Sequence, residues 1–95
     1  MRPDKETVNG IVYYIGYKGL NKDLSNFQRN FKYKIGHKYS VLDVDLSDKE
    51  CSYGLNLCYD LFESLFYGQK VFKCLVPISD DNPIHFGKDK FRCKE

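Results

Sequence analysis

Four cysteines and two histidines are the side chains of this sequence best suited to metal binding, because zinc prefers thiolate and imidazole ligands. These residues are Cys51, Cys58, Cys74, Cys93, His37 and His85. No two of the cysteines have the close spacing of a zinc knuckle. Cys58 and Cys74 lie in apolar segments, where ordinary core packing accounts for a cysteine. The sequence therefore predicts no metal site and no cofactor.

Nucleophilic catalysis would need a cysteine or serine beside a base that a third group orients. His37 lies in a basic stretch and His85 in an expected hairpin strand, and no hydrolase or metalloprotease motif surrounds either. Gly16 and Gly19 lack the following helix and the Lys-Ser/Thr pair of a phosphate-binding loop. We therefore expect a protein without catalytic residues, with a degenerate nucleotide-acting enzyme as one alternative.

Four carboxylates gather near the middle of the sequence, at Asp43, Asp45, Asp48 and Glu50. The first two alternate with apolar residues in a predicted strand over 42–46, so they share its outer face. The cluster lacks the glycine and ligand frame of an EF-hand loop. It is interpreted either as a solvated strand face or as an acidic patch. Such a patch would bind the basic groove of a host nucleic-acid-binding effector.

A basic stretch precedes the carboxylates, and aromatic residues are interleaved with it. Its cations are Lys18, Lys22, Arg29, Lys32, Lys34 and Lys38. Positive charge beside aromatic rings is typical of single-stranded nucleic-acid binding. However, the alternation over 31–35 places Phe31 and Tyr33 opposite the lysines, so we expect the rings to face the core. The lysines then form a basic outer face that contacts a protein partner or, alternatively, nucleic acid.

The elements that position these residues are five or six short strands and one helix. Strands are predicted at 11–17, 31–35, 42–46, 71–78, 84–86 and 91–93. Turn-forming residues at 18–26 and 79–83 separate some of them, and 87–90 closes a hairpin. This pattern predicts an α+β fold in which a curled antiparallel sheet carries the helix on one face.

The helix is predicted over about 56–67 from a single apolar stripe. Its members are Leu57, Cys58, Leu61, Phe62, Leu65 and Phe66, which recur with helical spacing. Asn56 suits the N-cap and Gly68 suits the position just past the C-terminal end. The stripe would then pack this helix against the sheet.

Ninety-five residues are enough for one domain. We expect residues 1–9 to form a flexible leader and 10–95 to form a single α+β domain. Residues 1–40 carry eight Lys and Arg against three Asp and Glu, whereas 41–67 carry one against six. That asymmetry favours an oriented surface field. No apolar run is long enough to span a membrane and the N-terminal residues do not form a signal peptide, so a cytoplasmic location in a host cell is expected.

Three motifs resemble those of an uncharacterised small domain family found in phages and low-GC bacteria. The family patterns are GYKGF-NKDL, F-x-Y-x-(V/I)-G-x-x-Y and C-x-x-G-(F/L)-x-x-C, and the resemblance covers about residues 16–78. The matching positions are Gly16, Tyr17, Lys18, Gly19, Asn21, Lys22, Asp23, Leu24, Phe31, Tyr33, Ile35, Gly36, Tyr39, Cys51, Gly54, Leu55 and Cys58. The resemblance implies a phage or mobile-element origin. Family members usually carry a histidine where this sequence has Asn56, which argues further against proton-transfer chemistry.

Together these features predict a small non-enzymatic module that binds a host protein and inhibits or modulates it, as anti-defence and anti-CRISPR proteins do. The supporting observations are the small size, the segregated charges and the absence of a catalytic motif. A nucleic-acid-binding accessory domain that uses the basic 18–38 stretch is the alternative.

Overall fold

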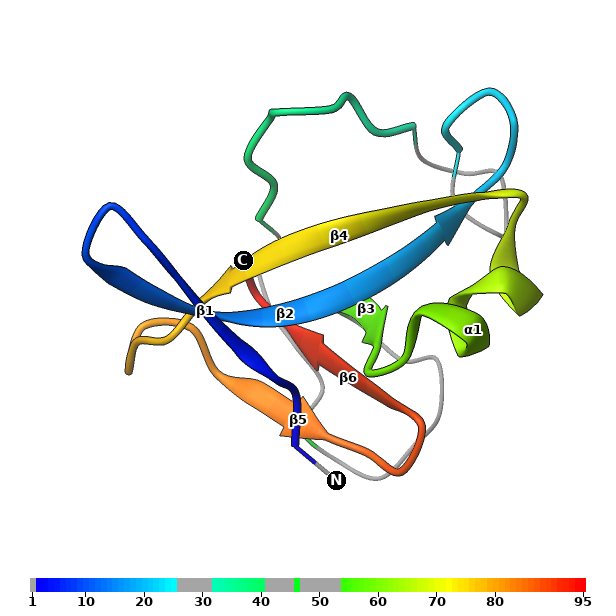
Figure 1. Cartoon of the computed structure of the whole chain (residues 1–95). Helices are drawn as coiled ribbons and strands as arrows, with labels where there is room; N and C mark the ends of the chain where they lie inside the picture. Colours follow the sequence, from blue (N-terminus) through cyan, green and yellow to red (C-terminus); the bar gives the residue numbers. More distant parts are fainter. Residues whose placement is uncertain (1, 26–31, 41–45, 47–53) are drawn as a thin grey trace.

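The computed structural model describes residues 2–25, 32–40, 46 and 54–95. Their elements, in chain order, are β1 (Lys5–Val8), β2 (Ile11–Leu20), β3 (Leu55–Cys58), α1 (Leu61–Ser64), a 3₁₀ turn (Leu65–Tyr67), β4 (Lys70–Pro77), β5 (Ile84–Phe86) and β6 (Lys90–Cys93). The strands form a curled antiparallel half-barrel, and the short helix lies at one end of it (Figure 1). The predicted α+β class is therefore confirmed.

Strand β2 is the centre of the sheet because it pairs with three other strands. Strand β4 pairs along it from Tyr13↔Pro77 to Leu20↔Lys70. Near its start β2 also pairs with β1, and near its end it pairs with β3. Strand β3 continues the sheet to β6, and β6 pairs with β5. The long strand therefore joins the two halves of the curled sheet.

The hairpin between β1 and β2 corrects the prediction that residues 1–9 are a leader outside the domain. Residues 5–8 pair with β2, and Val8 lies opposite Ile11. The two residues between them, Asn9 and Gly10, have φ values of 51° and 81°. A two-residue loop with positive φ at both positions matches the right-handed twist of a hairpin, and Asn-Gly favours it.

Strand β2 also runs further than the predicted 11–17. It continues to Leu20, because β4 pairs with it from Tyr13 to Leu20. Gly19, which the sequence placed in a turn, therefore lies inside the strand, as Gly16 does. At Gly16 a Cβ atom would come within 2.8 Å of side-chain atoms of Leu57 and Phe91. The glycine thus allows the core to close onto the strand.

The helix prediction over about 56–67 is wrong in its bounds. Residues 55–58 form strand β3, in which Leu57 and Cys58 lie opposite Phe91 and Lys90 of β6. The helix begins only after Asp60, whose carboxylate caps it by accepting a 2.8 Å hydrogen bond from the backbone N–H of Phe62. Pairing with a distant strand therefore overrides the local helical period, as tertiary context often does.

The predicted strand over 31–35 is also not formed in its described part. Lys32 makes an isolated bridge to Ser25, and Ile35 and Gly36 form a turn in which Gly36 has a φ of 81°. Tyr33 is half-buried as expected, but Ile35 is 73% exposed. Residue 31 and most of the predicted strand over 42–46 lie outside the described residues.

The C-terminal predictions agree closely with the structure. Strand β4 spans Lys70–Pro77 and ends at its proline, where the missing N–H disturbs the ladder least. A turn follows at residues 79–82, and β5 and β6 form the expected hairpin. These elements combine long apolar runs with strong turn signals, so local pattern and tertiary pairing agree.

The core lies between the two halves of the curled sheet. Its buried residues come from β3, β4, β6 and the residue after β3, namely Leu57, Val76, Phe91, Cys93 and Tyr59. The rings of Tyr59 and Phe91 stack with centroids 5.2 Å apart. The Tyr59 hydroxyl donates a 2.8 Å hydrogen bond to the carbonyl oxygen of Gly87, which satisfies its polar end.

Candidate functional site

The acidic cluster named in the sequence falls outside the described residues. Asp43, Asp45, Asp48 and Glu50 all lie there, as do Arg29 and Cys51. The acidic patch therefore stays a prediction.

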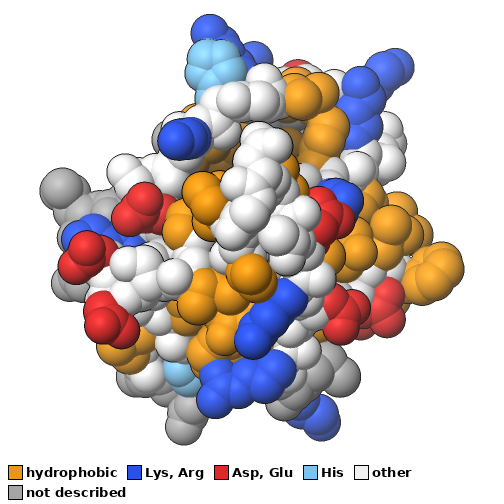
Figure 2. Space-filling view, turned by 60° about the vertical axis from the view of Figure 1, so that its left-hand side comes forward, with side chains coloured by type: hydrophobic (Ala, Val, Ile, Leu, Met, Phe, Trp, Pro, Cys, Tyr) orange, Lys and Arg blue, Asp and Glu red, His pale blue; other side chains and the backbone are white. Residues whose placement is uncertain are grey.

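Four of the predicted basic residues lie at the surface. Lys22, Lys32, Lys34 and Lys38 are exposed. Lys32 pairs with Asp23 at 3.7 Å, but both side chains are more than half exposed, so this ion pair contributes little stability. Figure 2 shows one side of the molecule, on which basic and acidic side chains are interspersed with apolar ones rather than gathered by sign.

The aromatic rings of this stretch pack against each other. Tyr33 and Tyr39 make an edge-to-face contact with centroids 4.9 Å apart. The Tyr39 hydroxyl also accepts a 2.5 Å hydrogen bond from the backbone N–H of Lys34. A nucleic-acid base that stacked on either ring would have to compete with this packing, so the geometry gives the nucleic-acid alternative no specific support.

Lys18 is an exception among the predicted basic residues, because its ammonium group points into the half-barrel. Its Nζ donates a 2.8 Å hydrogen bond to the carbonyl oxygen of Asn56 and lies 5.4 Å from the centroid of the Tyr33 ring. Burial lowers the pKa of this ammonium group, and the nearby thiols of Cys74, Cys58 and Cys93 oppose part of the shift. Lys18 therefore does not belong to an outer basic face.

Three thiols surround this lysine, and each is free. Cys58 and Cys93 are buried and Cys74 is half-buried. Burial raises the pKa of Cys58 to about 11 and that of Cys93 to about 12. Both thiols are therefore protonated at neutral pH, as expected for cysteines packed in a core. Packing of Cys58 in the core agrees with the sequence, although it lies on a strand and not on a helix.

The described residues contain no group of three or more His, Cys, Asp or Glu side chains that could hold a metal ion. His37 is exposed in the segment over 32–40, and His85 is half-buried in β5. The two histidines therefore lie on separate elements.

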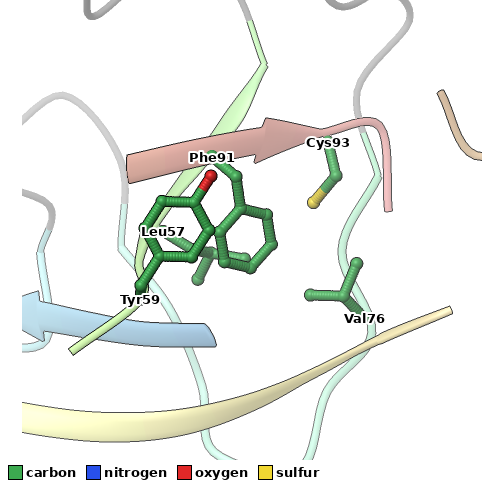
Figure 3. Packing of buried hydrophobic residues seen from close by; sticks show 5 residues of the cluster. All are labelled: Leu57, Tyr59, Val76, Phe91 and Cys93. Atoms are coloured by element: carbon green, nitrogen blue, oxygen red, sulfur yellow. The ribbon is translucent and has the colours of Figure 1, made fainter. Parts of the chain in front are cut away.

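A cavity of about 580 Å³ adjoins Lys18. One wall is formed by residues 72–78, from strand β4 and the residue after it, and another by the segment 33–39, which is drawn above β4 in Figure 1. Cys93 from β6 and Leu55 and Leu57 from β3 close its inner end. In Figure 3 the Cys93 sulfur, from β6, and Val76, from β4, point toward one another, so the cavity borders the core. The sequence alone gave no sign of this cavity.

The surface of the helical segment is the second feature that the sequence missed. Its large apolar side chains are exposed at 43% for Leu61, 73% for Phe62, 50% for Leu65 and 76% for Phe66. The buried residue of the segment is instead Ser64, whose hydroxyl donates to the carbonyl oxygen of Leu61. We call the side chains of Leu61, Phe62, Leu65 and Phe66 the α1 apolar patch. The four members of the predicted stripe that lie in the helical segment are therefore exposed, whereas Leu57 and Cys58 are buried in β3.

Backbone contact holds this segment against the sheet. A Cβ atom at Gly19 would overlap the carbonyl oxygen of Ser64, and one at Gly68 would overlap the backbone of Leu20. Both glycines therefore allow the helix to approach strand β2 closely. The patch is consequently held on a fixed support, with Phe62 and Phe66 mostly exposed and Leu61 and Leu65 about half exposed.

No protein-family model, curated protein or solved structure matches this chain. Within the described ranges, no helix is both long and apolar enough to cross a membrane.

Proposed function

We propose that this protein is a small non-enzymatic protein-binding module that inhibits or modulates a host protein, and that the α1 apolar patch makes the contact. The observation that carries the proposal is the exposure of Leu61, Phe62, Leu65 and Phe66 on one short helical segment. Soluble proteins seldom leave adjacent large apolar side chains uncovered, and such patches commonly mark interaction sites.

The aromatic and aliphatic side chains of the patch suit the central part of a protein–protein interface. Each phenylalanine ring can bury about 150–250 Å² when it enters a pocket on a partner. Aromatic anchors near the centre of an interface often carry much of the binding free energy. Because Gly19 and Gly68 hold the segment by backbone contact, little backbone order has to be gained on binding.

The charges beside the patch indicate what kind of partner it fits. Asp60 caps the helix and is exposed, Glu63 lies in its first turn, and the last turn carries no basic residue. An apolar groove with lysine or arginine side chains at its rim would complement this arrangement. A nucleic-acid-binding effector of the host offers such a surface, which supports an anti-defence role of the anti-CRISPR kind. A phage or mobile-element origin is part of the same proposal.

The test is a quantitative capture experiment with matched surface variants. The tagged protein is immobilised and exposed to lysate of a low-GC bacterium, and retained proteins are quantified by mass spectrometry. The contact variant is Phe62→Ser with Phe66→Ser, and the control is Ile35→Ser, which removes an apolar side chain that is also 73% exposed. We expect the wild type to retain one partner in stoichiometric amount. The contact variant should retain at least tenfold less of this partner, and the control variant should retain as much as the wild type.

Two results would contradict the proposal. One is a partner captured equally by the wild type and the contact variant. The other is concentration-dependent dimerisation that the contact variant abolishes, seen by sedimentation without any other partner. In that case the patch would be covered by a second copy of the chain.

A further inference from the structure

The cavity beside β4 has the size and lining of a small-molecule site. Its volume of about 580 Å³ falls within the ~300–1,000 Å³ range typical of such sites. Most of its lining is apolar, and Phe72, Val76 and Leu57 contribute to it. No residue of the helical segment 61–67 lines the cavity. Any role of the cavity is therefore independent of the α1 apolar patch.

Five exposed aliphatic side chains also line this cavity. They are Ile11, Val12, Ile35, Leu75 and Ile78, each at least 40% exposed. They come from three separate parts of the chain, namely the start of β2, the segment 33–39, and β4 with the residue that follows it. Apolar side chains that remain exposed around a cavity favour a ligand with an apolar portion, because its binding would remove them from water.

The charged groups of the lining are predominantly basic. They comprise four lysines and one carboxylate side chain, namely Lys18, Lys34, Lys38, Lys73 and Glu95. Lys73 is paired with Glu6 at 2.8 Å. Among the described residues, no carboxylate forms an ion pair with Lys18. An ammonium group has three N–H donors, and the bond to Asn56 uses one of them.

We propose that this cavity binds a long-chain carboxylate, with the acid group on the Lys18 ammonium group and the alkyl chain along the apolar walls. A carboxylate at Nζ supplies the partly desolvated ammonium group with an opposite charge that no described residue places there in an ion pair. It also accepts charge-assisted hydrogen bonds from the remaining donors. The alkyl chain lies along the apolar walls and covers the exposed side chain of Ile35. Burial lowers the pKa of Lys18, which agrees with an ammonium group that is poorly solvated before the ligand binds.

The test measures binding of dodecanoate by isothermal titration calorimetry, below the concentration at which it forms micelles. Dodecanol, with the same chain and no charge, is the matched ligand. Lys18→Met removes the inner charge and keeps an unbranched side chain, whereas Lys22→Met removes an exposed charge that does not line the cavity. We expect the wild type and Lys22→Met to bind dodecanoate alike. Lys18→Met should bind it at least tenfold more weakly, and dodecanol should bind the wild type at least tenfold more weakly than dodecanoate does.

A spectroscopic readout on the wild type covers the case in which Lys18→Met fails to fold. Dodecanoate should shift the side-chain NMR signals of Lys18 more than those of Lys22. The proposal is overturned if dodecanoate does not bind, or if dodecanol binds as tightly. It is also overturned if a folded Lys18→Met variant keeps wild-type affinity, or if the Lys18 signals do not move on saturation.

Discussion

Gly19 of strand β2 lies directly against the backbone carbonyl of Ser64, the buried residue of helix α1. The contact joins backbone to backbone, so it uses none of the large side chains of the helical segment. Phe62 and Phe66 are left mostly exposed in the α1 apolar patch. The relationship explains how a segment of seven helical residues can be fixed in place and still expose two phenylalanines.

Replacing Gly19 by alanine tests this relationship. The new methyl group would overlap the Ser64 carbonyl oxygen, and the backbone cannot yield cheaply. We expect Gly19→Ala to lower the free energy of unfolding by about 3 kcal/mol or more, measured by urea denaturation. Gly36→Ala is the control, because its φ of 81° is strained for alanine but its surroundings are open. That change should cost about 1–2 kcal/mol. Equal losses in the two variants would mean that α1 does not rest on Gly19.

Two phenylalanines in opposite environments give a second prediction. Phe91 is 1% exposed and stacks on Tyr59, whereas Phe66 is 76% exposed. Phe91→Ala should lower the free energy of unfolding by about 3–5 kcal/mol through loss of buried surface and creation of a cavity. Phe66→Ala should change it by no more than about 0.5 kcal/mol. Urea denaturation measures both. A loss of several kcal/mol in Phe66→Ala would show that the patch is packed within the protein.

The buried side-chain amide of Asn82 bonds to the C-terminal residues, and this gives a third prediction. The Asn82 side chain donates to the carbonyl oxygens of Pro77 and Glu95, and it accepts from the backbone N–H groups of Lys94 and Glu95. Asn82→Ala leaves these backbone groups without their partner, so we expect a loss of about 2–3 kcal/mol. The neighbouring Asp81 is exposed, and Asp81→Ala should stay within about 0.5 kcal/mol. Thermal unfolding of both variants would show whether their stabilities differ.

The buried thiols predict an alkaline dependence of stability. Burial raises the pKa of Cys93 from 9.0 to about 12, so the folded state binds the thiol proton more tightly than the unfolded state does. The contribution of this group is complete below about pH 9 and is lost as the pH rises toward 12. The free energy of unfolding of the wild type should therefore fall more steeply above pH 9 than that of Cys93→Ala. Lys18 is common to both proteins, so its own titration largely cancels in the difference. Parallel pH profiles would contradict the assignment.

The sequence predicts well where local pattern and tertiary pairing agree. The apolar run that forms β4 and the turn before β5 both carry strong local signals, and the structure contains both. The hairpin at Asn9 and Gly10 was missed although its signal is present. Asn-Gly between alternating residues is a strong indication of a two-residue turn.

The helix bounds could not be read from local period. Leu57 and Leu61 fit one apolar stripe, but Leu57 pairs with Phe91 on a strand from a distant part of the chain. The local sign of the boundary between strand β3 and helix α1 is the capping residue Asp60, and a single residue is a weak signal in a sequence. The outward direction of the patch depends on the approach of Ser64 to Gly19, which is a tertiary contact.

Whether the Lys18 side chain points inward can be inferred only when the end of strand β2 is known. When the strand is ended at residue 17, Lys18 falls in a turn and its direction is undefined. Once β2 extends to Leu20, period-two alternation places Lys18 on the same face as Gly16, whose missing side chain leaves room for Leu57 and Phe91. The cavity itself depends on the segment 33–39, whose first three residues belong to the strand that was wrongly predicted over 31–35.

Site-specific photo-cross-linking tests the central claim, that the α1 apolar patch binds a host protein. A benzoylphenylalanine side chain is placed at Phe62 in one protein and at Ile35 in another, because both positions are 73% exposed. Irradiation in a low-GC bacterial lysate, followed by mass spectrometry, identifies what each position touches. We predict one discrete host protein cross-linked from position 62 and not from position 35. A product from position 35 alone, or from position 62 only to a second copy of this chain, would contradict the claim.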